Sequence, residues 1–132
     1  PRFPGILDTG HNHNFSINGS HLRDWAAVPI NSLRRLGQIE EGGDTLPLFA
    51  ANVWIHCNRP RTRNVAPEKP PFLLRLDEGI AVQDKRIGVP RLPLLGLRAL
   101  ARNDLFLTTD GGKRCVHLRT LDWRTKLLRW LV

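Results

Sequence analysis

The sequence predicts an all-β domain built from short strands and tight turns. Ten prolines and eleven glycines are scattered through its 132 residues, which favours a turn-rich β protein over a helical bundle. Several short apolar or alternating stretches are separated by Gly- and Asp-containing turns, as expected for strands and hairpins. A chain of this length forms one domain and is long enough to bury a core.

The first strand is expected at residues 6–8, where two apolar residues run into Asp8, Thr9 and Gly10. Gly10 permits a sharp turn directly after this strand. A carboxylate at the end of a strand is held in place by the backbone, and this position suits acid–base chemistry. The alternative is a purely structural turn, because Asp, Thr and Gly all favour turns.

Histidines follow this turn. Phe15 and Ile17 alternate with polar neighbours, so a half-buried strand is expected there. His11 and His13 stand two residues apart, so on a strand they would face the same side and could share a metal ion. No Cys or Glu cluster lies beside them in the sequence. We therefore favour polar histidines in an Asn-rich turn, and we predict neither a metal nor another cofactor.

A short helix and a hairpin come next. Residues 20–26 are expected to be helical, with Ser20 as the N-cap, and Pro29 ends this segment. Two extended arms flank the Gly-rich stretch 41–44, which predicts a hairpin. Residues 49–56 are expected to form a core strand.

The second half of the chain repeats this pattern of strands and turns. A long irregular loop is expected at 58–71, which contains four prolines. Strands are expected at 72–76 and 80–82 around a hairpin turn at 77–79, and at 91–95. The remaining expected elements are a helix at 97–103 and a hairpin of 105–109 with 113–118.

Two of these segments together resemble the retropepsins, the single-domain aspartic proteases typified by retroviral proteases. The family pattern is apolar-apolar-Asp-Thr-Gly near the N-terminus, then apolar-apolar-Gly and a short helix near the C-terminus. Ile6-Leu7-Asp8-Thr9-Gly10 and Leu94-Leu95-Gly96 match it, and the resemblance spans roughly residues 6–118. It implies a closed retropepsin-like β-barrel over residues 1–120, with a shortened first strand and a short helix after Leu94-Leu95-Gly96.

The resemblance implies an aspartic endopeptidase with Asp8, Thr9 and Gly10 in the catalytic motif. A single chain carries this motif once, so a homodimer would bring two Asp8 carboxylates together around one water. The region around 36–48 would supply a flap over the peptide or protein substrate. The resemblance assigns the following residues to substrate binding: His11, Gly42, Gly43 and Gly96.

Three departures from the family pattern keep other functions open. His11 stands where the family usually has Ala or Ser, and the loop 58–71 is longer than usual. The family usually ends in a strand that joins the dimer interface, but the apolar residues of the tail 121–132 have the spacing of an amphipathic helix. Such a helix would pack on a neighbour or lie on a membrane surface. His11 and the shortened first strand favour a second hypothesis, a non-catalytic retropepsin-like module that binds a peptide or a partner protein.

The formal net charge of +8 raises a third hypothesis, a basic nucleic-acid-binding domain. The basic residues are mostly Arg and are dispersed, without a Lys-rich block, so no nucleic acid is expected as a partner. No apolar run approaches the length needed for a transmembrane segment. The chain begins at Pro1 without a signal peptide, so we expect a fragment or processed product and favour the cytoplasm.

Overall fold

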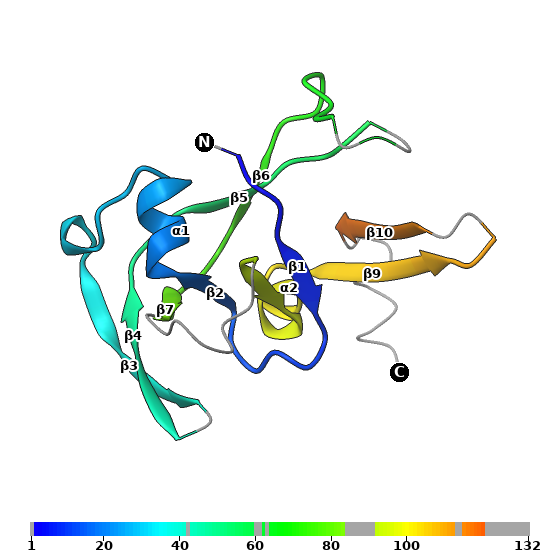
Figure 1. Ribbon diagram of the computed structural model, residues 1–132. Coiled ribbons are helices and arrows are strands. Elements are labelled where there is room, and N and C mark those ends of the chain that lie inside the picture. Colours follow the sequence, from blue (N-terminus) through cyan, green and yellow to red (C-terminus); the bar gives the residue numbers. More distant parts are fainter. Residues whose placement is uncertain are drawn as a thin grey trace. The chain divides into compact units, whose positions relative to one another are not determined.

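The computed structural model describes residues 2–41, 43–59, 62, 64–83, 92–112 and 115–120. Within these residues there are ten strands, two short α-helices and one 3-10 helix (Figure 1). The β-rich class predicted from the sequence is confirmed. The chain divides into two compact units, residues 1–99 and 100–132.

The first unit contains a six-stranded mixed sheet in the order β1-β8-β2-β7-β4-β3 (Figure 1). At its centre, β8 pairs in parallel with β1 and antiparallel with β2, and β2 pairs in parallel with β7. A separate two-stranded sheet joins β5 (Val53–Ile55) to β6 (Phe72–Leu74). The bounds in the large sheet are β1 (Ile6–Asp8), β2 (Phe15–Asn18), β3 (Arg35–Glu41), β4 (Asp44–Phe49), β7 (Ile80–Gln83) and β8 (Leu94–Gly96).

The large sheet is open. A closed barrel requires its first and last strands to be hydrogen-bonded to each other. Here β1 and β3 lie at opposite ends of the strand order. Among the described residues no closed barrel is formed, so the closed retropepsin-like barrel that the resemblance implies is not confirmed.

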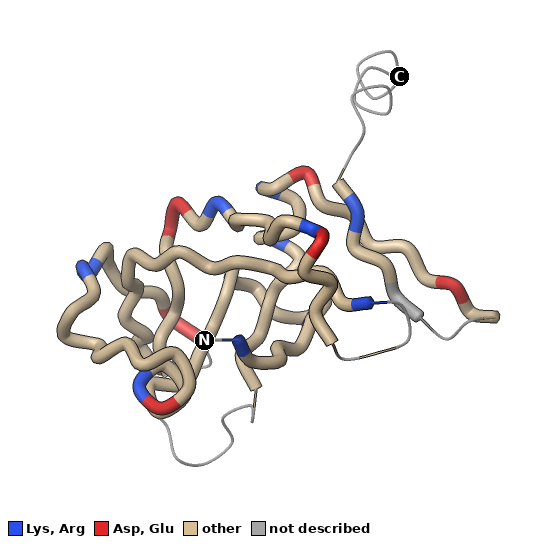
Figure 2. Tube along the Cα trace, turned by 90° about the horizontal axis from the view of Figure 1, so that it is seen from above, with Lys and Arg blue, Asp and Glu red and all other residues tan. Residues whose placement is uncertain are grey.

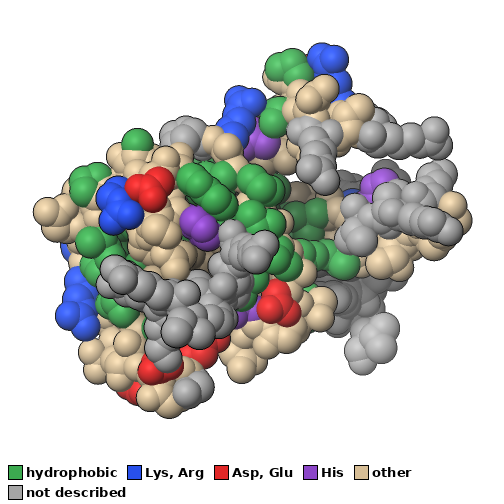
Figure 3. All heavy atoms as spheres, in the orientation of Figure 1, with side chains coloured by type: hydrophobic (Ala, Val, Ile, Leu, Met, Phe, Trp, Pro, Cys, Tyr) green, Lys and Arg blue, Asp and Glu red, His purple; other side chains and the backbone are tan. Residues whose placement is uncertain are grey.

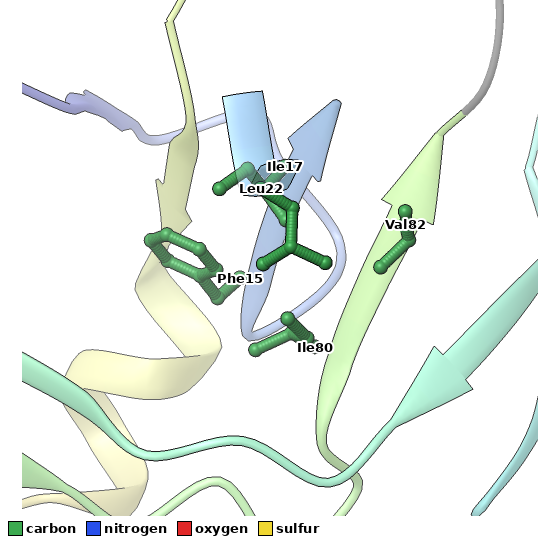
Figure 4. Packing of buried hydrophobic residues seen from close by; sticks show 5 residues of the cluster. All are labelled: Phe15, Ile17, Leu22, Ile80 and Val82. Atoms are coloured by element: carbon green, nitrogen blue, oxygen red, sulfur yellow. The ribbon is translucent and has the colours of Figure 1, made fainter. Parts of the chain in front are cut away.

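The core of the first unit lies between the sheet and helix α1 (Gly19–Asp24). Figure 4 shows side chains from β2, α1 and β7 gathered there: Phe15, Ile17, Leu22, Ile80 and Val82. Ala81, between the last two, is also buried, so β7 is covered on both faces. This placement explains the unbroken apolar run of β7, which is typical of a central strand.

Helix α1 is present where the sequence predicts it, but its N-cap differs. The Asn18 side chain accepts a hydrogen bond from the backbone N–H of Ser20 at 2.8 Å, and the backbone of Asn18 is extended. The predicted cap, Ser20, lies inside the first turn. Asn and Ser are both favourable N-cap residues, and Asn18 is the cap because β2 ends there and the helix begins at the next residue. A 3-10 helix, η1 (Ile30–Ser32), follows directly after Pro29.

The predicted hairpin around 77–79 is wrong in its pairing. The turn itself forms, with the Gly79 N–H donating to the Leu76 carbonyl at 2.7 Å and a Gly79 φ of +78°. However, β6 pairs with β5, whereas β7 pairs with β2 and β4. A Cβ on Gly79 would lie 2.3 Å from the Phe49 carbonyl oxygen, so this turn packs against the end of β4.

The end of the first unit and the second unit follow the sequence predictions closely. Helix α2 (Leu97–Arg102) starts directly after Gly96. In the second unit, β9 (Leu105–Asp110) and β10 (Cys115–Thr120) form the expected antiparallel hairpin. The predicted amphipathic helix at 121–132 lies outside the described residues, as does Gly42.

The structure differs from one expectation about burial. Trp54, predicted to lie in a core strand, is 50% exposed, and Cys57 is an exposed free thiol. Hydrophobic side chains therefore reach the surface, as the green areas of Figure 3 show. Figure 2 shows the described Lys and Arg residues in several short blue stretches along the trace, which agrees with the dispersed distribution in the sequence.

Candidate functional site

Asp8 ends β1 and begins a tight turn. Its Oδ1 accepts a hydrogen bond from the Gly10 N–H at 2.9 Å, and its carbonyl accepts one from the His11 N–H at 3.3 Å. Asp8 is half-buried, whereas Thr9 and Gly10 are exposed. The turn therefore fixes the direction of the Asp8 carboxylate and leaves the residues after it accessible.

Gly96 lies beside this turn, in β8. Its register partner in the parallel β1–β8 pair is Asp8, and its N–H donates to the Asn14 carbonyl at 3.1 Å. A Cβ on Gly96 would lie 2.0 Å from the His13 carbonyl oxygen and 2.8 Å from that of His11. The loop from Thr9 to Asn14 (the Asp8 loop) therefore passes so close to β8 that only a glycine fits at this position.

His11 is held inside the protein by Ser16 of β2. The His11 Nε2 and the Ser16 Oγ lie 2.7 Å apart, and both residues are buried. Burial lowers the pKa of His11 below its ordinary value of 6.5, an effect that the negative charges of Glu41 and Asp8 partly oppose. His13 lowers this pKa further. The imidazole of His11 is therefore neutral at pH 7.

Glu41 connects the β3–β4 hairpin to the Asp8 loop. Its Oε1 lies 3.7 Å from the His11 Nδ1 and 3.9 Å from the His13 Nε2. Its Oε2 accepts a hydrogen bond from the Gln83 Nε2 at 3.3 Å. The two imidazoles meet edge to face, with ring centroids 5.5 Å apart. One carboxylate at the end of β3 thus faces two histidines beside Asp8 and an amide of β7.

The order Ser16–His11–Glu41 is that of a hydrolytic triad: hydroxyl, imidazole and carboxylate. A nucleophilic serine must be reached by its substrate, and Ser16 is only 2% exposed, in the middle of the sheet. We therefore interpret its hydroxyl as the group that orients His11. The described part of the chain contains no group of three or more His, Cys, Asp or Glu residues suited to hold a metal ion.

A second polar contact anchors the far end of the Asp8 loop. The Asn14 Nδ2 donates to the Glu78 Oε2 at 3.5 Å, and the Glu78 Oε1 accepts from Arg98 at 2.7 Å. Asn14 is 2% exposed, and its Oδ1 has no hydrogen-bond partner among the described residues. The loop is therefore fixed by side chains at both ends, by Ser16 through His11 and by Glu78 through Asn14.

The structure brings together most of the residues that the sequence assigns to the site. Asp8, His11 and Gly96 are neighbours, and Thr9 and Gly10 lie in the same turn. Gly43 lies in the turn after β3 with a φ of +84°, and no atom of the described residues lies within 4 Å of the place that a Cβ would occupy, so its role there is conformational. Gly42, the other predicted hairpin residue, lies outside the described residues.

Sequence reasoning missed Ser16, Glu41 and Gln83. Ser16 and Glu41 are ordinary polar residues of a predicted strand and a predicted hairpin, Gln83 directly follows the predicted strand 80–82, and no local pattern marks any of them. The one signal in the sequence was that Glu41 stands directly before the glycines of the predicted flap. The strand pairing of β2, β7 and β4 is what brings these residues to the Asp8 loop.

Comparison with protein-family models, with curated proteins and with solved structures finds no match for this chain. Within the described residues, no helix has both the length and the apolar character needed to cross a bilayer.

Proposed function

We propose that this chain is one subunit of a homodimeric aspartic endopeptidase of the retropepsin type. The observation that supports the proposal is the pairing of Asp8 with Gly96 in β1–β8. The two motifs that resemble the family lie far apart in the sequence, and this pairing makes them neighbours. The Asp8 carboxylate is half-buried at the end of a strand, and the loop that follows it packs tightly over a glycine. These contacts hold the carboxylate in a fixed position, as a catalytic group requires.

In this proposal, two Asp8 carboxylates from two copies share one proton and hold one water. The ionised carboxylate takes a proton from the water, and the oxygen of that water attacks the carbonyl carbon of the peptide. The protonated carboxylate donates its proton to the carbonyl oxygen, which gives a geminal diol. The C–N bond of the diol then breaks, as one carboxyl group donates a proton to the leaving nitrogen and the other carboxylate takes a proton from a diol hydroxyl. The β3–β4 hairpin would cover the bound peptide. No cofactor takes part in these steps.

The decisive experiment compares Asp8→Asn with the wild type in digestion of a peptide library from acidic to neutral pH. We expect Asp8→Asn to abolish cleavage while the thermal unfolding midpoint stays close to that of the wild type. Asp24→Asn is the matched control, because Asp24 is an exposed carboxylate that forms an ion pair with its sequence neighbour Arg23. Equal cleavage by the wild type and Asp8→Asn would refute the proposal.

The requirement for two copies has its own test. Sedimentation velocity at assay concentrations should show a dimer. The cleavage rate per chain should fall when the protein is diluted below the dissociation constant of the dimer. A strictly monomeric protein that cleaves peptides would contradict the shared pair of Asp8 carboxylates.

A second candidate is a non-catalytic module of the same shape that binds a peptide or partner protein. The observation that favours it is the buried His11, which stands where the family usually has a small residue and is tied to Ser16. A monomer that binds peptides in calorimetry and leaves them intact would support this candidate over the protease.

A further inference from the structure

Glu78 joins the Asp8 loop to the first turn of helix α2. Its Oε1 accepts a hydrogen bond from the Arg98 guanidinium at 2.7 Å, and its Oε2 accepts one from the Asn14 Nδ2 at 3.5 Å. A carboxylate has two acceptor oxygens, so it can hold a partner on each side at the same time. One side chain thus connects three segments that are distant in the sequence: the loop, the turn at 77–79 and α2.

The backbone of Glu78 is fixed, whereas its side chain depends on its partners. The Gly79 N–H donates to the Leu76 carbonyl at 2.7 Å, the turn packs against the Phe49 carbonyl, and Ile80 of β7 follows directly in the core. The Glu78 side chain itself is 38% exposed. Without the Arg98 guanidinium, its carboxylate would therefore turn toward water more often.

Asn14 is the residue through which this contact reaches the candidate site. It is 2% exposed, and its Oδ1 has no hydrogen-bond partner among the described residues, so the contact from its Nδ2 to Glu78 orients the side-chain amide. Its backbone carbonyl accepts from the Gly96 N–H at 3.1 Å, and Gly96 is the register partner of Asp8. The orientation of Asn14 therefore bears directly on how the Asp8 loop crosses β8.

We infer that Glu78 is a positioning residue through which Arg98 of α2 holds the Asp8 loop in place. The guanidinium binds one carboxylate oxygen at the surface and thereby keeps the other oxygen directed at Asn14. When the guanidinium is removed, the carboxylate turns toward solvent and the buried Asn14 amide loses its acceptor. A buried polar group without a partner is costly, so the loop opens more often.

The consequence for catalysis rests on the proposed function, whereas the coupling from Arg98 to the loop does not. If Asp8 is the catalytic carboxylate, a loosened loop holds it in the reactive position for less of the time. Peptide binding elsewhere in the site is unaffected by this change. Arg98→Ala and Glu78→Ala should then lower kcat more than they raise KM.

NMR of the full chain tests the coupling without any assay of activity. The reporters are the side-chain amide signals of Asn14 and the hydrogen exchange of the His11 and Gly96 backbone amides, which donate to the Asp8 and Asn14 carbonyls. Glu78→Ala and Arg98→Ala should each shift the Asn14 signals and speed both exchanges about two- to tenfold, the range for one lost hydrogen bond. Arg98→Lys keeps the positive charge and should restore part of the protection.

Two controls separate this coupling from a general loss of stability. Asp77→Ala removes an exposed carboxylate from the same turn and should leave all three reporters at their wild-type values. The backbone amides of β7 report on the core, and in Glu78→Ala and Arg98→Ala their exchange should change less than that of His11 and Gly96.

The double variant Glu78→Ala/Arg98→Ala decides whether Arg98 acts through Glu78. If it does, the double variant should show the same exchange rates as Glu78→Ala alone. The inference is overturned if the two effects multiply, or if Arg98→Ala leaves the Asn14 signals and the exchange of His11 and Gly96 unchanged. None of these readouts depends on cleavage. Inactive wild-type protein that shows the coupling would refute the protease alone, and cleavage without the coupling would refute this inference alone.

Discussion

Gly96 is paired with Asp8 across the parallel β1–β8 strands, and the carbonyl oxygen of His13 lies 2.0 Å from where a Gly96 side chain would begin. The Asp8 loop can thus lie against β8 only while residue 96 has no side chain. This contact joins the two sequence motifs physically and makes Gly96 a determinant of the position of Asp8.

Gly96→Ala should therefore be strongly destabilising. The new methyl group meets backbone, which cannot rotate away as a side chain can, so we expect a loss of about 2–4 kcal/mol in the free energy of unfolding. Urea denaturation measures this loss. Gly37→Ala is the control, because a Cβ there has no atom within 4 Å in the part of the chain that the structure describes, and its effect should stay within about 1 kcal/mol. Equal effects of both variants would contradict the tight crossing of the loop.

Ser16→Ala should destabilise the protein by about 1–3 kcal/mol, because it leaves the buried Nε2 of His11 without its partner. Ser32→Ala removes a hydroxyl that also makes a 2.7 Å hydrogen bond, to the Pro29 carbonyl, but on the exposed surface. That control should change stability by less than about 0.5 kcal/mol. Thermal or urea unfolding of the two variants separates the buried bond from the exposed one.

The free energy of unfolding should decrease as the pH is lowered below about 6.5, the ordinary value from which burial lowers the pKa of His11. The unfolded chain then binds a proton that the folded chain resists, so the unfolded state is favoured as pH falls from 6.5 toward the folded pKa. Urea unfolding from pH 8 to pH 5 measures this slope.

His11→Gln should flatten that slope. His56→Gln, which changes a histidine outside the group of His11, His13 and Glu41, should not. The Asp24 carboxyl acts in the same direction, because its hydrogen bond to Arg23 lowers its pKa below 3.8, but only at much more acidic pH. A slope that survives in His11→Gln would show that another group is responsible.

Ile80→Ala should cost about 2–5 kcal/mol of the free energy of unfolding, because Ile80 is 1% exposed and belongs to the buried cluster in Figure 4. Ile30→Ala removes the same atoms from a side chain that is 41% exposed and should cost less than half as much. Chemical denaturation provides both values. A comparable loss at the two positions would contradict the placement of the core.

Local features of the site could be predicted from the sequence because they depend on neighbouring residues. The apolar pair before Asp8 forms the expected strand, Gly10 closes the expected turn, and α2 starts after Gly96. The hairpin with Gly43 in its turn also follows from local residue types, since a positive φ favours glycine.

The partners of these features could not be predicted, because they depend on which strands pair. Residues 77–79 form the predicted turn, yet β6 and β7 enter different sheets. The same limit applies to His11: its sequence neighbours suggested a polar, Asn-rich turn, and only the packing of β2 and β3 beside the loop buries it against Ser16 and Glu41.

By itself, then, the sequence determined a β-rich chain with an acidic strand end, a glycine-bearing strand and short helices, since hydrophobic periodicity and turn chemistry act over a few residues. Only the tertiary structure decided that Asp8 lies beside Gly96, that the large sheet stays open, and that Glu41 reaches His11 and His13. Strand register and strand order set these contacts, and they arise from the packing of segments that are distant in the sequence.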